Sequence, residues 1–221
     1  MNPNPPGWHG KLPSLGDFAS RRLDPAFVEA WDGWLAAGLL RLREAQPQAW
    51  LDAYLASPSW RFLVMPGVLP VPGAWAGVLM PSVDRVGRYF PFTIAVPLGD
   101  APATTRQMGE LWHWLARLDE LAGDALQDDW TVDRLEDELA RMQGPDLAAT
   151  DGAAPVLPAE PGAVLTLQAD VADAIGAEAQ ALWRCAAAVR AYWFASSEVV
   201  GRQLLVSRGL PAAAQLLGTT I

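Results

Sequence analysis

The chain has few of the side chains that commonly carry enzyme chemistry. Its 221 residues include one cysteine, Cys185, and two histidines, His9 and His113. A single cysteine cannot form an internal disulfide, and it excludes a zinc or iron–sulfur site built from cysteines, so we expect a reducing compartment. The apolar neighbourhood of Cys185 favours a small core residue. Neither histidine lies in an HExxH or His-x-His pattern, so we predict no catalytic residue, no metal site and no cofactor.

Long hydrophobic runs are also missing. No stretch of 18 apolar residues exists, and prolines interrupt the nearest candidates at positions 66, 70, 72 and 81. The first six residues lack the basic and apolar regions of a secretory signal. We therefore expect a cytoplasmic protein with no direct membrane insertion.

Basic residues are outnumbered, with 16 against 25 acidic ones and a formal net charge of −9. This balance argues against binding nucleic acid or anionic lipid by charge, so no nucleic-acid partner is predicted. Nearly all the excess lies in residues 100–138, which hold three arginines and eleven acids. This segment has two open interpretations: a solvated helix face, or a docking face for a basic partner.

The chain is rich in apolar residues. Apolar residues make up 51% of it, charged residues only 19%, and there are 11 tryptophans. This composition is typical of a folded domain with a sizeable core. We expect most tryptophans to pack helices onto a sheet, and any exposed one is a candidate for partner contact.

The apolar periodicities predict an α+β fold. Short alternating or apolar runs predict strands at 7–12, 60–65, 74–80, 89–96, 191–195 and 203–206. Helical spacing predicts helices at 25–43, 46–55, 104–121, 131–142 and 172–189. Strands that follow one another favour a mostly antiparallel sheet of about five to six strands flanked by helices. We expect a single domain over 1–221 with a surface loop at 144–162, and Pro91 predicts an edge position or a bulge in its strand.

The densest polar cluster within the apolar strands runs from Ser82 to Arg88. Arg85 and Arg88 flank a glycine at an expected hairpin tip, where two guanidinium groups can hold a carboxylate or a phosphate. The alternative is that Asp84 and Arg85 form the turn and Arg88 pairs with a neighbour. Asp17 completes the set of candidate binding residues: Asp17, Asp84, Arg85 and Arg88.

Five short segments of the chain match, one after another, the sequence motifs of a known protein family. They are residues 7–18 (GWHGKLPSLGDF), 27–35 (FVEAWDGWL), 60–62 (WRF), 77–91 (GVLMPSVDRVGRYFP), and the closing pairs of landmarks at 192–193 (YW) and 209–211 (GLP). Together they resemble the TagF (ImpM) family, accessory proteins of bacterial type VI secretion systems. The chain departs from this pattern at Phe194, where a second tryptophan is expected.

The resemblance implies a non-enzymatic cytoplasmic protein that represses the secretion apparatus post-translationally. It implies a forkhead-associated scaffold protein as partner, a link to the threonine phosphorylation pathway, and an α/β sandwich for which a longin-like arrangement is one candidate. In that case exposed tryptophans and arginines from the five segments should form one patch. Two rival hypotheses are a small phosphate- or carboxylate-binding enzyme using Asp17, Asp84, Arg85 and Arg88, and a structural piece of the secretion machine.

Overall fold

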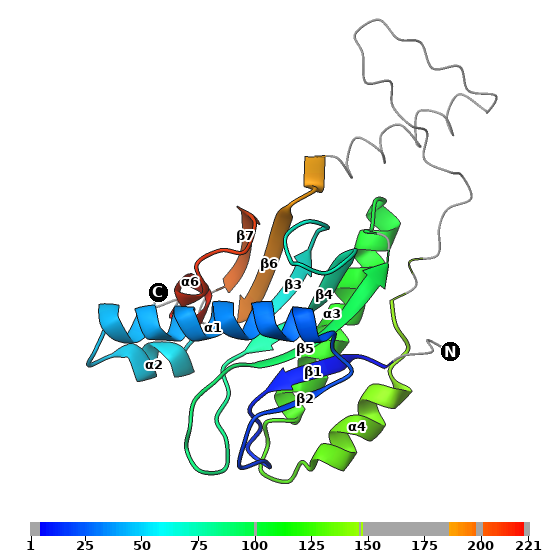
Figure 1. The fold of residues 1–221 in the computed structure, drawn as a ribbon. Coiled ribbons are helices and arrows are strands. Elements are labelled where there is room, and N and C mark those ends of the chain that lie inside the picture. Colours follow the sequence, from blue (N-terminus) through cyan, green and yellow to red (C-terminus); the bar gives the residue numbers. More distant parts are fainter. Residues whose placement is uncertain (1–4, 100, 146, 148–185, 198–200, 219–221) are drawn as a thin grey trace, which may run out of the picture.

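Seven strands form a single open sheet in the computed structural model, which describes residues 5–99, 101–145, 147, 186–197 and 201–218. They are β1 (Gly7–Gly10), β2 (Ala19–Arg21), β3 (Trp60–Val64), β4 (Ala74–Met80), β5 (Phe92–Gly99), β6 (Arg190–Ser197) and β7 (Gly201–Arg208). Their order is β2-β1-β5-β4-β3-β6-β7, and every neighbouring pair is antiparallel (Figure 1). The predicted α+β single domain with an antiparallel sheet is confirmed. The strand that the sequence did not predict is the three-residue β2.

Helices cover both faces of this sheet. They are α1 (Pro25–Ala45), α2 (Trp50–Leu55), α3 (Thr105–Asp124), α4 (Val132–Arg141) and α6 (Ala213–Leu217). Figure 1 shows α1 crossing the strands on one face and α3 on the opposite face. The helix α2 and the helix α6 pack beside α1, whereas α4 lies on the α3 side. Most of the helix predicted at 172–189, with Cys185, and most of the loop predicted at 144–162 lie outside the described residues.

Local sequence signals explain where the long helices begin. Asp24 caps α1 by accepting a hydrogen bond from the Ala26 N–H at 2.8 Å, with proline in the first turn. Thr104 and Gln107 form a reciprocal capping box at the start of α3. Thr131 caps α4 by accepting from the Arg134 N–H. These contacts confirm helix starts that the sequence predicts.

Each face of the sheet carries its own hydrophobic core. On the α1 face, Trp31 stacks near Trp193 with ring centroids 6.0 Å apart, and its indole N–H donates to Thr93 Oγ1 at 2.9 Å. On the α3 face, Trp8 packs with Ile94 and Leu115. All three tryptophans are fully buried, as expected for rings that join helices to a sheet.

The interpretation of Pro91 as an edge or bulge residue was wrong. The strand β5 begins one residue later, at Phe92, and it is an internal strand between β1 and β4. Pro91 therefore precedes the ladder and removes no hydrogen bond from it. Its carbonyl instead approaches Gly10, where a Cβ would lie 2.2 Å from that oxygen and where φ is +129°. Only glycine fits this approach without strain.

Candidate functional site

Two loops that are distant in sequence meet at one end of the sheet. We call residues 11–18, between β1 and β2, the N-terminal loop, and residues 81–91, between β4 and β5, the hairpin loop. The Arg85 N–H donates to the Leu15 carbonyl at 2.9 Å, and the Ser82 hydroxyl donates to the Lys11 carbonyl at 2.7 Å. These bonds hold the two loops side by side, and we refer to them together as the paired loops.

Asp84 is the buried hub of the paired loops. One carboxylate oxygen accepts hydrogen bonds from Lys11 Nζ at 2.6 Å and from Arg88 Nε at 2.7 Å. The other accepts from the backbone N–H groups of Val86 at 3.0 Å and Arg88 at 2.9 Å. Because its side chain is fully buried and both oxygens are occupied, Asp84 shapes the hairpin and faces no ligand.

The charge state of Asp84 follows from these contacts. Burial by itself raises the pKa of this carboxyl group. The hydrogen bonds from Lys11 and Arg88 outweigh that effect and hold the pKa of Asp84 well below its usual range. The carboxylate is therefore ionised at neutral pH, and the buried ammonium group of Lys11 compensates its charge.

Lys11 is the residue that sequence reasoning missed at this site. Besides pairing with Asp84, its ammonium group lies 4.1 Å from the centroid of the Phe18 ring. The Phe18 ring packs edge-on against Phe90, with centroids 4.8 Å apart. One signal in the sequence pointed to Lys11: it is the sole lysine among 16 basic residues.

Above this buried pair, the paired loops present a mixed polar and apolar surface. Arg88 Nη2 lies 3.6 Å from Asp17 Oδ1, and Arg88 also donates to the Gly16 carbonyl. The Arg85 guanidinium lies over Gly16, and it has no ion-pair partner among the described residues. Val86 is 64% exposed and Phe18 is 46% exposed. We call the exposed residues Asp17, Phe18, Arg85, Val86 and Arg88 the loop surface.

The structure therefore brings the four candidate residues together but separates their roles. Asp84 forms the turn and Arg88 pairs with it, as the structural alternative in the sequence analysis expected. Asp17, Arg85 and Arg88 remain at the surface. Ligand binding by these residues stays a prediction.

Tyr54 anchors the hairpin loop from below. Its hydroxyl donates to the Ser82 carbonyl at 2.9 Å and accepts from the Ser82 N–H at 2.8 Å. Burial raises the pKa of this hydroxyl well above its usual range, so it stays protonated. The helix α2, which carries Tyr54, thus fixes the position of the loop.

The acidic segment 100–138 forms much of α3 and α4, and several of its carboxylates have local basic partners. Glu136 pairs with Arg22 and accepts from the Trp8 indole N–H at 2.5 Å. Burial raises the pKa of Glu136, but the hydrogen bonds from Arg22 and Trp8 outweigh it and lower that pKa. Glu136 therefore joins α4 to β1. Such internal pairing favours a structural role for this part of the segment over a docking face for a basic partner.

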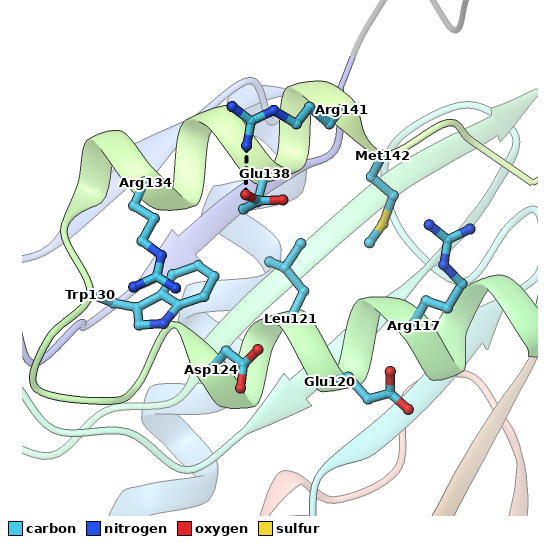
Figure 2. Close-up of a pocket in the computed structure, with 9 residues that line it drawn as sticks. All are labelled: Arg117, Glu120, Leu121, Asp124, Trp130, Arg134, Glu138, Arg141 and Met142. Carbon is cyan, nitrogen blue, oxygen red and sulfur yellow. Dashed lines mark hydrogen bonds and ion pairs between the residues drawn. The ribbon is translucent and has the colours of Figure 1, made fainter.

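A pocket of about 370 Å³ lies between α3 and α4 (Figure 2). Both helices contribute charged groups to it, and Glu138 and Arg141 form a hydrogen-bonded ion pair at 2.6 Å within it. Trp130 lies in the connection between the helices, with the Arg134 guanidinium 4.3 Å from its ring centroid. The pocket is thus lined by both acidic and basic side chains, and pairing between them neutralises part of their charge.

Tryptophan does not contribute to the loop surface. Each tryptophan in the described part of the chain is buried or half-buried, so the expected patch of exposed tryptophans was wrong. The tryptophans form the core, and Phe18 and Val86 are the large apolar residues exposed near Arg85 and Arg88.

The part of the chain that the structure describes lacks two further kinds of feature. No group of three or more histidine, cysteine, aspartate or glutamate side chains there could hold a metal ion. No helix within those residues is both long enough and apolar enough to span a membrane.

Comparison with known proteins places this chain in a family. Residues 7–142 match the model of the TagF N-terminal domain, described as type VI secretion system-associated. The crystal structure of PA0076 from Pseudomonas aeruginosa PAO1 is similar, with a TM-score of 0.74 and 34% sequence identity, over 97% of this chain and 94% of that one. No curated protein matches. The family match spans both paired loops and more than half of the chain, and the chain therefore belongs to the TagF family of type VI secretion system-associated proteins.

Proposed function

We propose that this protein is a cytoplasmic, non-enzymatic regulator that binds another component of the type VI secretion system through the loop surface. One observation carries the proposal. The exposed residues Asp17, Phe18, Arg85, Val86 and Arg88 form a single surface, which the buried Lys11–Asp84 pair and the hydrogen bonds between the two loops hold in place. A surface held in one shape loses less conformational entropy when it binds a partner.

The composition of the loop surface also supports protein binding. Arginine and aromatic residues are enriched where protein interfaces gain most of their binding energy. Here the exposed Phe18 and Val86 offer apolar contact, and Arg85 offers a guanidinium that forms no ion pair among the described residues. The partner surface should therefore combine an apolar site with at least one carboxylate or phosphate group.

The partner we propose is the forkhead-associated scaffold protein of the secretion system. The TagF family is associated with type VI secretion, so its members have secretion-system partners. Binding to the scaffold would link the protein to the threonine phosphorylation pathway and repress the apparatus after translation. In this role the protein acts by binding a surface of the scaffold, and it catalyses no reaction.

A small phosphate- or carboxylate-binding enzyme is the second candidate function. It is favoured by the position of Arg85 and Arg88 beside Asp17. Against it, Asp84 uses both carboxylate oxygens for internal bonds, and the Arg88 side chain is already bound to Asp84, Asp17 and Gly16. An anion would have to compete with these contacts.

The test is a direct binding measurement with the purified forkhead-associated scaffold from the same secretion system. Arg85→Glu and Val86→Asp change the loop surface and keep Lys11 and Arg88, the two side chains that bond the Asp84 carboxylate. Arg41→Glu is the matched control, because Arg41 is an exposed arginine on α1 and belongs to neither of the paired loops. Titration of the wild type with inorganic phosphate runs in parallel. Scaffold binding lost only in the two loop variants supports the proposal, whereas phosphate binding without scaffold binding supports the enzyme.

A further inference from the structure

The strand β7 is the longer of the two edge strands in the sheet that the described residues form. It spans eight residues and pairs only with β6 within the described part of the chain. Figure 1 shows it at the border of the sheet, beyond β6. Three consecutive apolar residues are exposed there: Leu204 at 61%, Leu205 at 38% and Val206 at 48%. An edge that is long and apolar is a template for pairing with another strand.

The opposite edge of the same sheet differs. The strand β2 has three residues, and a partner strand can form few hydrogen bonds with so short an edge. The contrast makes β7 the edge suited to strand addition. It also lies outside residues 7–142, the part matched by the family model, so this inference does not depend on the paired loops.

One face of β7 has a regular pattern of side chains. Because side chains alternate along a strand, Arg202, Leu204, Val206 and Arg208 point to the same side. Leu204 pairs with Phe194, and Val206 pairs with Tyr192, on β6. This is the side that faces α3.

An apolar groove of about 620 Å³ adjoins this side of β7. Leu204, Phe194 and Trp112 of α3 line it, and the rings of Trp112 and Phe194 lie 5.9 Å apart. A side chain from a strand added to β7 would lie next to this groove. The surface therefore offers backbone hydrogen bonds at the edge and an apolar site beside it, the combination used in strand-addition recognition.

Charge on β7 indicates the kind of partner. Arg202 and Arg208 are exposed, and neither has an ion-pair partner among the described residues. The described residues of β6 and β7 contain no acidic side chain at all. The two arginines thus place positive charge at both ends of the apolar stretch.

A second copy of the chain fits this edge poorly in the register that is centred on Leu205. Two β7 strands paired antiparallel about Leu205 would place Arg202 of each copy opposite Arg208 of the other. Like charges directly opposite in neighbouring strands are destabilising. A partner with carboxylates at these two positions would instead form two cross-strand ion pairs.

We propose that β7 binds an extended segment of a partner protein with the pattern acidic-x-apolar-x-apolar-x-acidic, paired antiparallel. In this register the two acidic residues lie opposite Arg208 and Arg202, and the two apolar residues lie opposite Val206 and Leu204. The two carboxylates are six positions apart in this pattern because Arg202 and Arg208 are six positions apart in β7.

The probe is a fluorescein-labelled peptide, Gly-Ser-Asp-Thr-Val-Thr-Val-Thr-Asp-Ser-Gly, and its control has lysine at both aspartate positions. The wild-type chain should bind the aspartate peptide at least about tenfold more tightly than the lysine peptide. The double variant Arg202→Glu, Arg208→Glu should reverse that preference, and Arg41→Glu should keep it. Circular dichroism confirms that each variant is folded before titration.

Hydrogen–deuterium exchange distinguishes strand addition from simple groove binding. The aspartate peptide should slow exchange at β7 amides, because the edge N–H groups then donate to the peptide backbone. Equal affinity for the two peptides, binding weaker than about 1 mM, or binding without protection of β7 would overturn the proposal. Without peptide, the wild type and the double variant are compared for self-association. Concentration-dependent dimers of the wild type that the double variant does not form would assign the edge to a second copy and would also overturn the proposal. Loop variants that lose scaffold binding but keep peptide binding would separate this result from the proposed function.

Discussion

Lys11 Nζ lies 2.6 Å from Asp84 Oδ2, and both side chains are buried where the N-terminal loop meets the hairpin loop. The pair joins two segments separated by more than 70 positions in the sequence. Its burial explains how two polar loops can hold a fixed surface at the end of the sheet.

Replacing Lys11 with methionine should destabilise the protein markedly. The change keeps most of the side-chain volume but removes the buried positive charge, leaving Asp84 with Arg88 as its one cationic partner. Breaking a buried ion pair from one side costs about 3 kcal/mol. Urea denaturation measures the free energy of unfolding, with Arg41→Met as the exposed control. A Lys11→Met protein as stable as that control would show that the pair does not hold the loops together.

Stability should depend on pH through Asp84. The pKa of its carboxyl group is lowered in the folded state, so its stabilising contribution is fully present above the unfolded value of about 4. The contribution then falls as the pH drops below that value toward the lower folded pKa. The stability difference between the wild type and Asp84→Asn should therefore be large at about pH 6 and smaller at about pH 3. A difference that stays constant between these two conditions would contradict the assignment.

Tyr54→Phe should loosen the hairpin loop. The variant removes the hydroxyl that bonds both the N–H and the carbonyl of Ser82. The Ser82 N–H then loses its partner in a buried position, whereas the Ser82 carbonyl keeps the Phe90 N–H as a donor. Leaving buried groups unpaired costs about 1–3 kcal/mol. Thermal or chemical denaturation provides the measurement. Tyr89→Phe is the control, since it keeps the ring contacts with Trp50 and Tyr54 and removes a hydroxyl with no hydrogen bond among the described residues. Equal stability of the two variants would argue against the Tyr54 hydroxyl holding the hairpin loop in place.

Two glycine substitutions should have opposite effects. Gly10→Ala would place a Cβ 2.2 Å from the Pro91 carbonyl oxygen at a φ of +129°, so we expect a loss of more than about 2 kcal/mol. Gly33 lies within α1 with no atom within 4 Å of a built Cβ, so Gly33→Ala should stabilise the protein by about 0.5–1 kcal/mol. Denaturation of both variants in one buffer gives the comparison. Tolerance of alanine at Gly10 would mean that β1 and Pro91 do not approach so closely.

Much of the fold follows from local sequence signals. The caps at Asp24, Thr104 and Thr131 set helix starts, and apolar runs mark β3 and β4 within one residue of their ends. The short β2 and α6 were missed because three and five residues are too few to establish a periodicity. Pro91 misled because a proline at the start of an apolar run cannot be told from one inside the strand without the pairing.

The candidate site was predicted in part. The sequence identified Asp17, Asp84, Arg85 and Arg88, since polar residues within an apolar stretch are conspicuous. It did not distinguish the buried Asp84 from its exposed neighbours, because burial depends on the N-terminal loop packing against the hairpin loop. Phe18 and Val86 are exposed at this site, whereas the described tryptophans pack helices onto the sheet, as composition predicted, and none of them is exposed for partner contact.

The central claim is that the loop surface binds the forkhead-associated scaffold of the type VI secretion system. The most direct measurement is the Kd of the purified scaffold for the wild type, Arg85→Glu, Val86→Asp and Arg41→Glu, with each variant first shown to unfold at the wild-type temperature. The account predicts at least about tenfold weaker binding for the two loop variants and unchanged binding for Arg41→Glu. Wild-type affinity in both loop variants would contradict it.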